Sequence, residues 1–495
     1  HLYQNAFQEN SHYDNLLREN GRSPWYGLYE KNGLGTTVDS IKTDKGIDSL
    51  MYDNTILKVQ LTNPILPKET INFDIKFTTY WGSGSNRRRM KAYYVENKFV
   101  HFNGVHWYPR ISVYDRKFGW TTEQHLDKEF YGDFGTFDVE LNFPDDYIVE
   151  ATGTLTNEAQ VLPDSLKKKL HISNYYHRGS EDDGDTLSII TQRKARKVWK
   201  YYAENVHDFA FTADPTYRLD EAVWNGIKCI SVVEERHCPK WKTAAKFAAE
   251  VIKVYSEDFG MYAYPKMVVA DAQDGMEYPM LTLNSGKSPH YRGLIAHEIG
   301  HNWFYGMLGS NETYRAMMDE GFTQFLTAWS LMKIDGEIYK PYQKDFNNAF
   351  LNKYRHRLKT LDIRAYLGYL NAAVKREDPT LNTHSSDFSG GAIRHGGGYG
   401  QVYTKTAVML YNLQYVLGDS LFLSAMQHYV DKWKFSHPYP NDFRTSIIEH
   451  VGTDLNWFFD QWMETSKVID YSVGKVKHLN KDTFLIQFER KGEMQ

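Results

Sequence analysis

Two histidines and a glutamate between residues 297 and 320 have the spacing of a metal site. His297 and His301 are four residues apart in the segment His-Glu-Ile-Gly-His, and Glu320 follows nineteen residues after His301. On a helix, side chains four residues apart project from the same face, so both imidazoles can reach one ion. Catalytic zinc usually has three protein ligands and one position for water. The spacing therefore predicts one zinc ion held by His297, His301 and Glu320.

Glu298 directly follows the first histidine and is predicted to act in the reaction without binding the metal. Zinc held by two imidazoles and a carboxylate lowers the pKa of its bound water to about 7 and polarises a carbonyl. A carboxylate beside the ligands can accept the proton of that water and pass it to the leaving nitrogen. These residue types in this order favour hydrolysis, with Glu298 as the general base.

Apolar residues on both sides of the ligands indicate the two helices that must position them. Leu294, Ile295 and Ile299 make an apolar stripe beside the histidines, and Gly300 leaves room for close packing. Apolar residues also recur at helical spacing after the third ligand, at Phe322, Phe325, Leu326, Trp329 and Met332. We therefore expect Glu320 to begin a second amphipathic helix that packs on the first.

Alternating apolar residues predict an antiparallel β domain over residues 1–195. The clearest runs have a period of two, at 57–61 and 137–143, and turn residues separate them. From about residue 196 the periodicity becomes helical, with a stripe at 244–255. Residues 196–466 are therefore expected to form the mostly helical domain that carries the metal.

The end of the chain carries two further strand patterns, at 473–476 and 484–488, around a turn. Two strands alone make a marginal sheet, so we expect residues 467–495 to begin a further β domain that continues beyond this chain. The first residues have neither a Met nor a signal-peptide pattern, which indicates a trimmed piece of a longer protein. The expected fold class is α+β with several domains.

The composition of the 495-residue chain is that of a globular protein, with 41% hydrophobic residues. The formal net charge of -4 gives no electrostatic case for binding nucleic acid or an anionic membrane. No run of about eighteen apolar residues predicts a transmembrane segment, and nothing assigns a compartment. Cys229 and Cys238 are the only cysteines, and a disulfide between them stays open.

Three motifs together resemble the aminopeptidase N family of zinc metallopeptidases, which includes the leukotriene hydrolase type. The first is the metal motif described above. The second is Gly275-Met276-Glu277-Tyr278-Pro279, which is similar to the Gly-x-Met-Glu-Asn strand that this family places along its substrate, although the residues before Met and after Glu depart from that form. The resemblance implies that Glu277 binds the free α-amine of the substrate and that backbone groups near Gly275 and Met276 pair with the peptide.

The third motif is the segment 402–408, which resembles the Tyr-Glu-Lys-Gly segment of the family. The resemblance implies that the hydroxyl of Tyr403 stabilises the oxyanion of the tetrahedral intermediate, with Tyr399 as the alternative. Thr404 and Thr406 replace the family's Glu and Gly, and Tyr403 lies 106 residues past His297, farther than expected.

A fourth family feature is weak in this chain. Members commonly offer a Gln from the β domain as a second contact to the substrate amine. The corresponding stretch, residues 101–109, contains no Gln. Either Asn103 substitutes for it or the contact is absent.

The resemblance implies an N-terminal β domain, a thermolysin-like catalytic domain, a small β-sandwich and a helical C-terminal domain, of which the first two and the start of the third fit this chain. The expected function is a zinc aminopeptidase that acts on peptides with a free N-terminus. The alternatives are an endopeptidase or epoxide hydrolase on the same scaffold, and a catalytically silent scaffold that binds proteins. Glu277 favours the aminopeptidase, and the retained ligands and Glu298 disfavour the silent scaffold.

Overall fold

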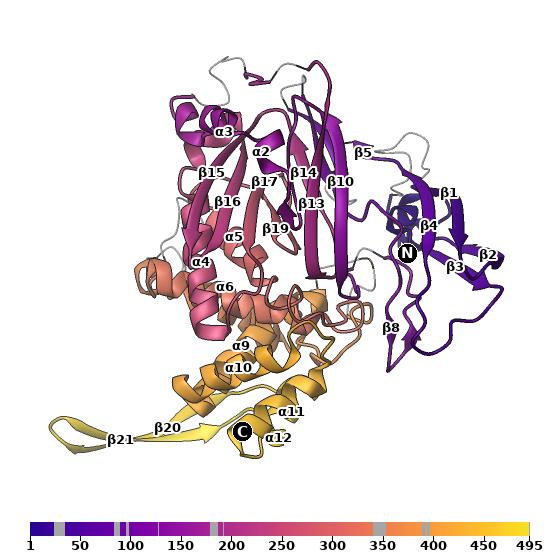
Figure 1. Ribbon diagram of the computed structural model, residues 1–495. Coiled ribbons are helices and arrows are strands. Elements are labelled where there is room, and N and C mark those ends of the chain that lie inside the picture. Colours follow the sequence, from indigo (N-terminus) through magenta and orange to yellow (C-terminus); the bar gives the residue numbers. More distant parts are fainter. Residues whose placement is uncertain are drawn as a thin grey trace.

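The computed structural model has a β-rich N-terminal half and a helical C-terminal half, which confirms the predicted α+β class (Figure 1). Strands of the first half lie above and to the right of the helices that follow them. The structure describes residues 1–23, 35–83, 90–95, 99–126, 128–178, 187–191, 193–339, 353–388, 393 and 397–494.

The N-terminal edge consists of two short helices and two antiparallel strand pairs, β1 with β4 and β2 with β3. These pairs are the outermost strands at the right of Figure 1. The predicted alternation at 57–61 falls in β3. The elements of this edge are η1 (Tyr3–Phe7), α1 (His12–Glu19), β1 (Thr36–Thr43), β2 (Ile47–Asp53), β3 (Ile56–Leu61) and β4 (Phe73–Thr79).

Two further sheets enclose the core of the β region. One has the strand order β11-β14-β7-β6-β5, and the other has the order β10-β13-β12. Their elements, with the short pieces between them, are β5 (Gly82–Ser83), β6 (Lys91–Val95), β7 (Phe99–Gly104), β8 (Tyr114–Asp115), β9 (Gly119–Trp120), β10 (Gly135–Pro144), β11 (Ile148–Ala151), β12 (Thr154–Leu155), α2 (Glu158–Val161), α3 (Asp164–Leu170), η2 (Ile172–Tyr175), β13 (Arg196–Val206) and β14 (Phe211–Asp214). Buried Trp199, Tyr201 and Phe211 belong to the core between them.

The helical pattern starts later than residue 196. β13 begins at Arg196 and pairs with β10 along its whole length, so strand pairing crosses the expected boundary at 195. The division into domains at 195 and 466 therefore stays a prediction. β17 is buried on both faces, so its sequence has a continuous apolar run instead of the alternation that predicts a strand.

A mixed five-stranded sheet follows, in the order β15-β16-β17-β19-β18. β16, β17 and β19 are parallel, whereas β18 runs antiparallel to β19 at the edge of the sheet. The strands are β15 (Tyr217–Trp224), β16 (Ile227–Glu234), β17 (Lys266–Asp271), β18 (Met276–Tyr278) and β19 (Leu281–Asn284). An edge strand has backbone groups on its outer side that another strand can pair with.

The helices pack against one face of this sheet and against one another around a second, larger core. The stripe at 244–255 forms α4, which ends at Gly260, and Glu320 begins α6 as predicted. The elements are η3 (Glu235–Lys240), α4 (Ala244–Phe259), α5 (Tyr291–Gly300), η4 (Ala316–Met318), α6 (Glu320–Asp335), η5 (Arg355–Arg357), η6 (Asp362–Tyr366), α8 (Leu367–Lys375), η7 (Gly397–Gly400), α9 (Gln401–Leu417), α10 (Asp419–Trp433), α11 (Pro440–Val451) and α12 (Asn456–Glu464).

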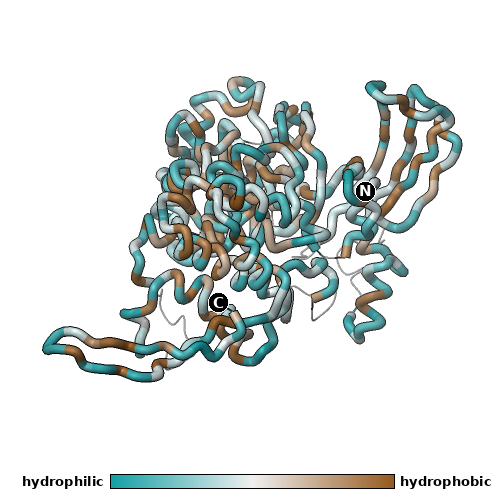
Figure 2. The backbone as a smooth tube through the Cα atoms, turned by 90° about the horizontal axis from the view of Figure 1, so that it is seen from below, coloured by the Kyte–Doolittle hydropathy of each residue, from teal (hydrophilic) through white to brown (hydrophobic). Residues whose placement is uncertain are grey.

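The two strands predicted at the end of the chain form a hairpin, β20 (Tyr471–Asn480) with β21 (Thr483–Arg490). It projects away from the body of the molecule in both views, and hydrophobic positions alternate along it (Figures 1 and 2). Val476, Phe484 and Phe488 are among its exposed apolar side chains. Continuation of this hairpin into a β-sandwich stays a prediction.

Two findings address points that the sequence left open. Cys229 and Cys238 are both buried and free, so they form no disulfide in this structure. Of the helices in the described residues, none combines the length and the apolar character needed to cross a membrane.

Candidate active site

The three predicted metal ligands meet where α5 and α6 pack together. α5 ends at Gly300, His301 continues its helical backbone, and Glu320 is the first residue of α6. A Cβ atom at Gly300 would lie 3.0 Å from Cγ2 of Thr323, so any larger residue would crowd this approach of the helices. The glycine thus allows the second helix to return its carboxylate to the two histidines.

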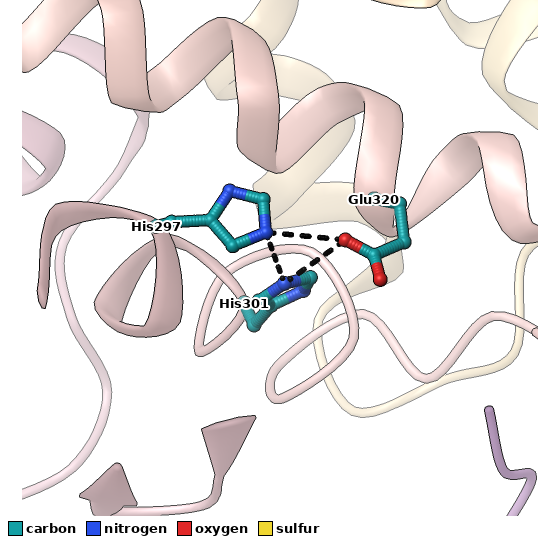
Figure 3. Close-up of side chains that lie close together, drawn as sticks. All are labelled: His297, His301 and Glu320. Atoms are coloured by element: carbon teal, nitrogen blue, oxygen red, sulfur yellow. Dashed lines mark hydrogen bonds and ion pairs between the residues drawn. The ribbon is translucent and has the colours of Figure 1, made fainter. Parts of the chain in front are cut away.

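The ligand atoms form a tight triangle, which we call the metal triangle (Figure 3). Nε2 of His297 lies 3.1 Å from Nε2 of His301 and 3.1 Å from Oε2 of Glu320. The third side, from Nε2 of His301 to Oε2 of Glu320, is 3.4 Å. Bonds of about 2.1 Å in tetrahedral geometry place two ligand atoms roughly 3.4 Å apart. The donor set and its spacing therefore fit one zinc ion.

The other ring nitrogens of both histidines have partners that fix the imidazole orientation. Nδ1 of His301 is hydrogen-bonded to Oδ1 of Asp319, and Nδ1 of His297 lies 3.3 Å from Oγ1 of Thr327. Such outer partners hold a ligand's tautomer and direct its free nitrogen to the metal. No role for Asp319 was predicted from the sequence. A carboxylate directly before the third ligand could have indicated such an outer partner.

Glu298 lies beside the metal triangle and is 4% exposed. One side-chain atom each from Glu298, Glu277 and His301 lies within 4.8 Å of the others. Burial raises the pKa of Glu298 to about 8. A Cβ atom at Gly275 would be 3.1 Å from Oε1 of Glu298, so the glycine keeps the space beside this carboxylate open.

The strand β18 carries Glu277 toward the same side of the site. Side chains alternate along a strand, and Met276 and Tyr278 belong to the core of the β region, so Glu277 points the other way. In the described part of the chain, β18 pairs only with β19, which leaves its outer edge for an extended peptide. Gly275 and Met276 thus lie where substrate contacts are expected from the sequence. Their role stays a prediction.

Three buried carboxylates, Glu129, Glu277 and Glu312, form what we call the acidic cluster. One oxygen of each lies within 4.8 Å of the other two. Burial is the main cause that raises the pKa of Glu277 well above its ordinary value, and the charges of Glu129 and Glu298 raise it further against the opposing effect of His301. A cation that entered this cluster would be strongly favoured.

The structure brings Glu129, and not Asn103, to Glu277. Asn103 is fully buried, its Nδ2 donates to the carbonyl of Ala272 at 3.0 Å, and its Oδ1 lies 2.8 Å from Nε2 of His101. The second contact to the substrate amine was expected in the stretch 101–109. The carboxylate comes instead from a loop that follows β9, where no local pattern marks it.

Tyr403 lies against the metal triangle. Its hydroxyl donates a hydrogen bond to Oε1 of Glu320, and its ring lies nearly parallel to that of His297, with 6.1 Å between centroids. Tyr399 packs edge-on to Phe388 with its ring centroid 4.0 Å from Nζ of Lys128. These contacts support Tyr403 over Tyr399, and its part in the reaction stays a prediction.

Close packing of α9 on α6 brings Tyr403 to this place. A Cβ atom at Gly321 would lie 2.3 Å from the carbonyl oxygen of Val402 and 2.3 Å from Cβ of Thr406, so no larger residue fits there. The glycine after the third ligand therefore determines how near the tyrosine helix can come.

A protein-family model matches the part of the chain that carries Tyr403. The model of the peptidase family M1 domain matches residues 398–462, which include Tyr403 and α9 to α11. Hydrolase, metallopeptidase and aminopeptidase assignments are consistent with this match.

Curated relatives are aminopeptidases with low sequence identity. Aminopeptidase 2 of Candida albicans is 22% identical over 318 residues, which are 60% of this chain and 31% of the relative. The alanine/arginine aminopeptidase of Saccharomyces cerevisiae is 23% identical over 261 residues, which are 48% of this chain and 28% of the relative. The matched part of the chain thus spans less than a third of these relatives.

Solved structures share the fold. The M1 zinc metallopeptidase of Deinococcus radiodurans has a TM-score of 0.57 at 14% identity, over 88% of this chain and 84% of that protein. Aminopeptidase A of Legionella pneumophila, in complex with aspartic acid, also has a TM-score of 0.57 at 14% identity, over 92% of this chain and 47% of that protein. A mutant of the Deinococcus protein was solved with the substrate Tyr-Ser-Ala.

Proposed function

The family-model match, the aminopeptidase relatives and the shared fold support the aminopeptidase N family, and from this premise we propose that the chain is the catalytic part of a zinc aminopeptidase. It hydrolyses the first peptide bond of substrates with a free N-terminus. The observation that carries the proposal is the acidic cluster directly beside the metal triangle, because it combines a hydrolytic metal site with a binding site for a cation.

One zinc ion would be held by His297, His301 and Glu320. When bound there, zinc supplies Lewis-acid chemistry, because it polarises the scissile carbonyl and lowers the pKa of a water to about 7. The side chains that surround the metal triangle then divide the remaining tasks.

Glu298 handles the proton. Its carboxylate accepts a proton from the attacking water and delivers it to the nitrogen of the leaving peptide. The buried position of Glu298 and the open space at Gly275 support this role, since water and the scissile bond need room on that side.

Tyr403 stabilises the negative charge that develops on the carbonyl oxygen. A phenol hydroxyl fixed beside the metal ligands can donate a hydrogen bond to that oxygen when its single proton turns from Glu320 to the substrate. The hydrogen bond that the Tyr403 hydroxyl donates to Glu320 keeps this hydroxyl beside the metal triangle.

Glu277 and Glu129 bind the α-ammonium group of the substrate. A carboxylate that pairs with a buried ammonium makes a charge-assisted hydrogen bond. The peptide pairs along the outer edge of β18 through Gly275 and Met276, so that its first residue ends at the acidic cluster. An internal peptide bond has no ammonium there, which favours exopeptidase over endopeptidase activity.

For the whole protein, we also propose domain boundaries at residues 195 and 466 and a β-sandwich domain that begins with β20 and β21. A helical C-terminal domain beyond this chain is part of the same proposal. Each rests on the resemblance to the family.

A panel of aminoacyl chromogenic substrates, assayed with and without a zinc chelator, tests the function. We expect chelator-sensitive release of the chromophore from free aminoacyl substrates and little release from their N-acetylated forms. Cleavage of acetylated peptides at the same rate would instead favour the endopeptidase reading. Activity on epoxides alone would favour the epoxide hydrolase, and no turnover by the zinc-loaded protein would favour the silent scaffold.

A further inference from the structure

Residues 271–275, which we call the anchored loop, join the end of β17 to β18 and are held by side chains from β6, β7 and β15. Three successive carbonyl groups of this loop each accept one hydrogen bond from a buried side chain. The pairs are Tyr217 Oη to the carbonyl of Asp271 at 3.1 Å, Asn103 Nδ2 to that of Ala272 at 3.0 Å, and Lys91 Nζ to that of Gln273 at 2.6 Å. Because the three donors belong to three different strands, the loop cannot shift without losing at least one of these bonds.

The backbone of the anchored loop has a conformation that needs such support. Gln273 has a φ of 50°, in the left-handed region that a residue other than glycine adopts mainly where its surroundings impose it. The N–H groups of Ala272 and Asp274 both donate to the carbonyl of Asn284 in β19, at 2.9 and 3.4 Å. Nζ of Lys91 also lies 3.0 Å from Oδ2 of Asp274. The loop is therefore held from the sheet on one side and by side chains on the other.

The anchored loop leads directly into the strand that is proposed to bind the substrate. Gly275 ends the loop, and Glu277 follows two residues later. At the other end of β18, the hydroxyl of Tyr278 lies 3.0 Å from Nε2 of His106, which follows β7. Since β18 has only three residues, its position depends on the segments at its two ends. A displacement of about 1 Å in a site can lower the rate by about 10²-fold.

Asn103 is the middle anchor, and its amide has a fixed orientation. Its Oδ1 accepts hydrogen bonds from Nε2 of His101 at 2.8 Å and from Oγ1 of Thr212 at 3.2 Å. The ring of His101 is held in turn, because its Nδ1 lies 2.9 Å from Oδ2 of Asp214. With its oxygen fixed in this way, the amide directs its nitrogen at the carbonyl of Ala272.

We propose that Asn103 is a positioning residue: as the middle anchor of the loop, it sets the place of Glu277 and of the edge of β18 that pairs with the peptide. This inference rests on the proposed function in taking that edge and Glu277 as the binding site of the substrate. It gives Asn103 a role other than the contact with the substrate amine that was expected from the sequence.

Asn103→Leu removes the amide and keeps a similar volume. It should raise KM for free aminoacyl substrates by about 10-fold and change kcat by less than about threefold, because Glu298 and Tyr403 lie on helices and not on this loop. Zinc content should not change. Amide hydrogen exchange over residues 272–278 should become about 10-fold faster, because the loop has lost one of its anchors.

Tyr147→Phe is the matched control. The hydroxyl of Tyr147 donates to the carbonyl of Val100 at 2.8 Å, so this variant also loses one hydrogen bond to β7, the strand that carries Asn103. It leaves the anchored loop untouched. KM and the exchange of residues 272–278 should therefore stay as in the wild type.

The outcomes separate this inference from the function. A wild type that hydrolyses no free aminoacyl substrate would refute the proposed function, and hydrogen exchange in Asn103→Leu would then decide whether Asn103 positions the loop. In an active enzyme, an unchanged KM in Asn103→Leu, a loss confined to kcat, or an equal rise of KM in Tyr147→Phe would overturn the role of Asn103.

Tyr217→Phe decides if Asn103→Leu does not fold, because it removes only the hydroxyl that anchors the neighbouring carbonyl of the same loop. It should raise KM by about threefold and speed the exchange of residues 272–278. Wild-type values of both would refute the anchoring of β18 by this loop.

Discussion

The metal triangle and the acidic cluster lie side by side but have opposite charge balances. In the metal triangle, two imidazoles flank the single carboxylate of Glu320, and a zinc ion would complete the set. In the acidic cluster, three carboxyl groups lie close together, and burial, followed by the charges of Glu129 and Glu298, raises the pKa of Glu277. One region is thus ready for a resident metal, and the other is ready for a cation that arrives with the substrate.

The comparison predicts that the two regions respond differently to mutation. Removing a ligand should remove the metal and with it most of the activity. Removing an acid should leave the metal in place and affect only substrates that carry an ammonium group.

His297→Ala should abolish zinc binding, because two remaining ligands no longer hold a closed set. Metal analysis should find about one zinc per wild-type chain and almost none in the variant. Zinc at 100 times its dissociation constant should stabilise the wild type by about 2.7 kcal/mol and leave the variant's melting temperature unchanged. Full zinc occupancy in both His297→Ala and His301→Ala would show that the metal lies elsewhere.

Glu298→Gln should keep the zinc but lower kcat by about 10²-fold to 10⁴-fold, because the amide cannot accept the proton of the attacking water. The measurement is kcat on a free aminoacyl substrate together with zinc content. Near-normal turnover with normal zinc would remove Glu298 from the mechanism.

Tyr403→Phe should lower kcat by about 10²-fold to 10³-fold with little change in KM, since the hydroxyl meets the substrate oxygen most strongly when that oxygen is negatively charged in the transition state. Tyr399→Phe is the matched control, because Tyr399 precedes Tyr403 by one helical turn and packs against Phe388. If Tyr399→Phe shows the loss and Tyr403→Phe does not, the two roles must be exchanged.

The same comparison explains what could be predicted from the sequence. The metal triangle is local, because His297, His301 and Glu320 lie within 24 residues. Helical spacing places the two histidines on one face, and the packing of α6 on α5 adds Glu320. The amphipathic helix at 320 and the stripe of α4 followed from periodicity in the same way.

The acidic cluster could be predicted only in part, because its members are far apart in the sequence. Glu277 came from a motif, but Glu129 and Glu312 lie 148 residues before and 35 residues after it. Neither has a periodic neighbourhood, and sheet pairing and loop anchoring place them. Strands buried on both faces, such as β17, escaped detection because they do not alternate.

Glu277→Gln should raise KM and lower kcat/KM for free-amine substrates by about 10-fold to 150-fold, which corresponds to the 1.5 to 3 kcal/mol of a hydrogen bond to a charged group. Zinc content should not change. The free protein should melt at the same or a higher temperature, because one of three crowded acids is gone. N-acetylated substrates, which lack the ammonium, should lose little further activity in this variant.

The smallest expected effect belongs to Glu129→Gln, and it decides whether the β region completes the substrate site. Glu129 shares the acidic cluster with Glu277 but is carried by a loop of the β region, so it should act as the second contact to the ammonium. A neutral amide retains one hydrogen-bonding oxygen, so the loss should be about 0.5 to 1.5 kcal/mol, or roughly 2-fold to 10-fold in kcat/KM. The effect should appear in KM and only for free-amine substrates.

Glu123→Gln is the matched control, because Glu123 lies in the same loop and is exposed. It should change KM by less than twofold, since an exposed carboxylate in water contributes little. A double variant of Glu129→Gln and Glu277→Gln should lose less or more than the sum of the single losses, because both acids contact one ammonium. Two results would show that Glu129 does not contact the amine: additive losses in the double variant, or an equal effect of Glu129→Gln on acetylated and free substrates. Glu277 would then be the only acid of the cluster that binds the substrate's N-terminus.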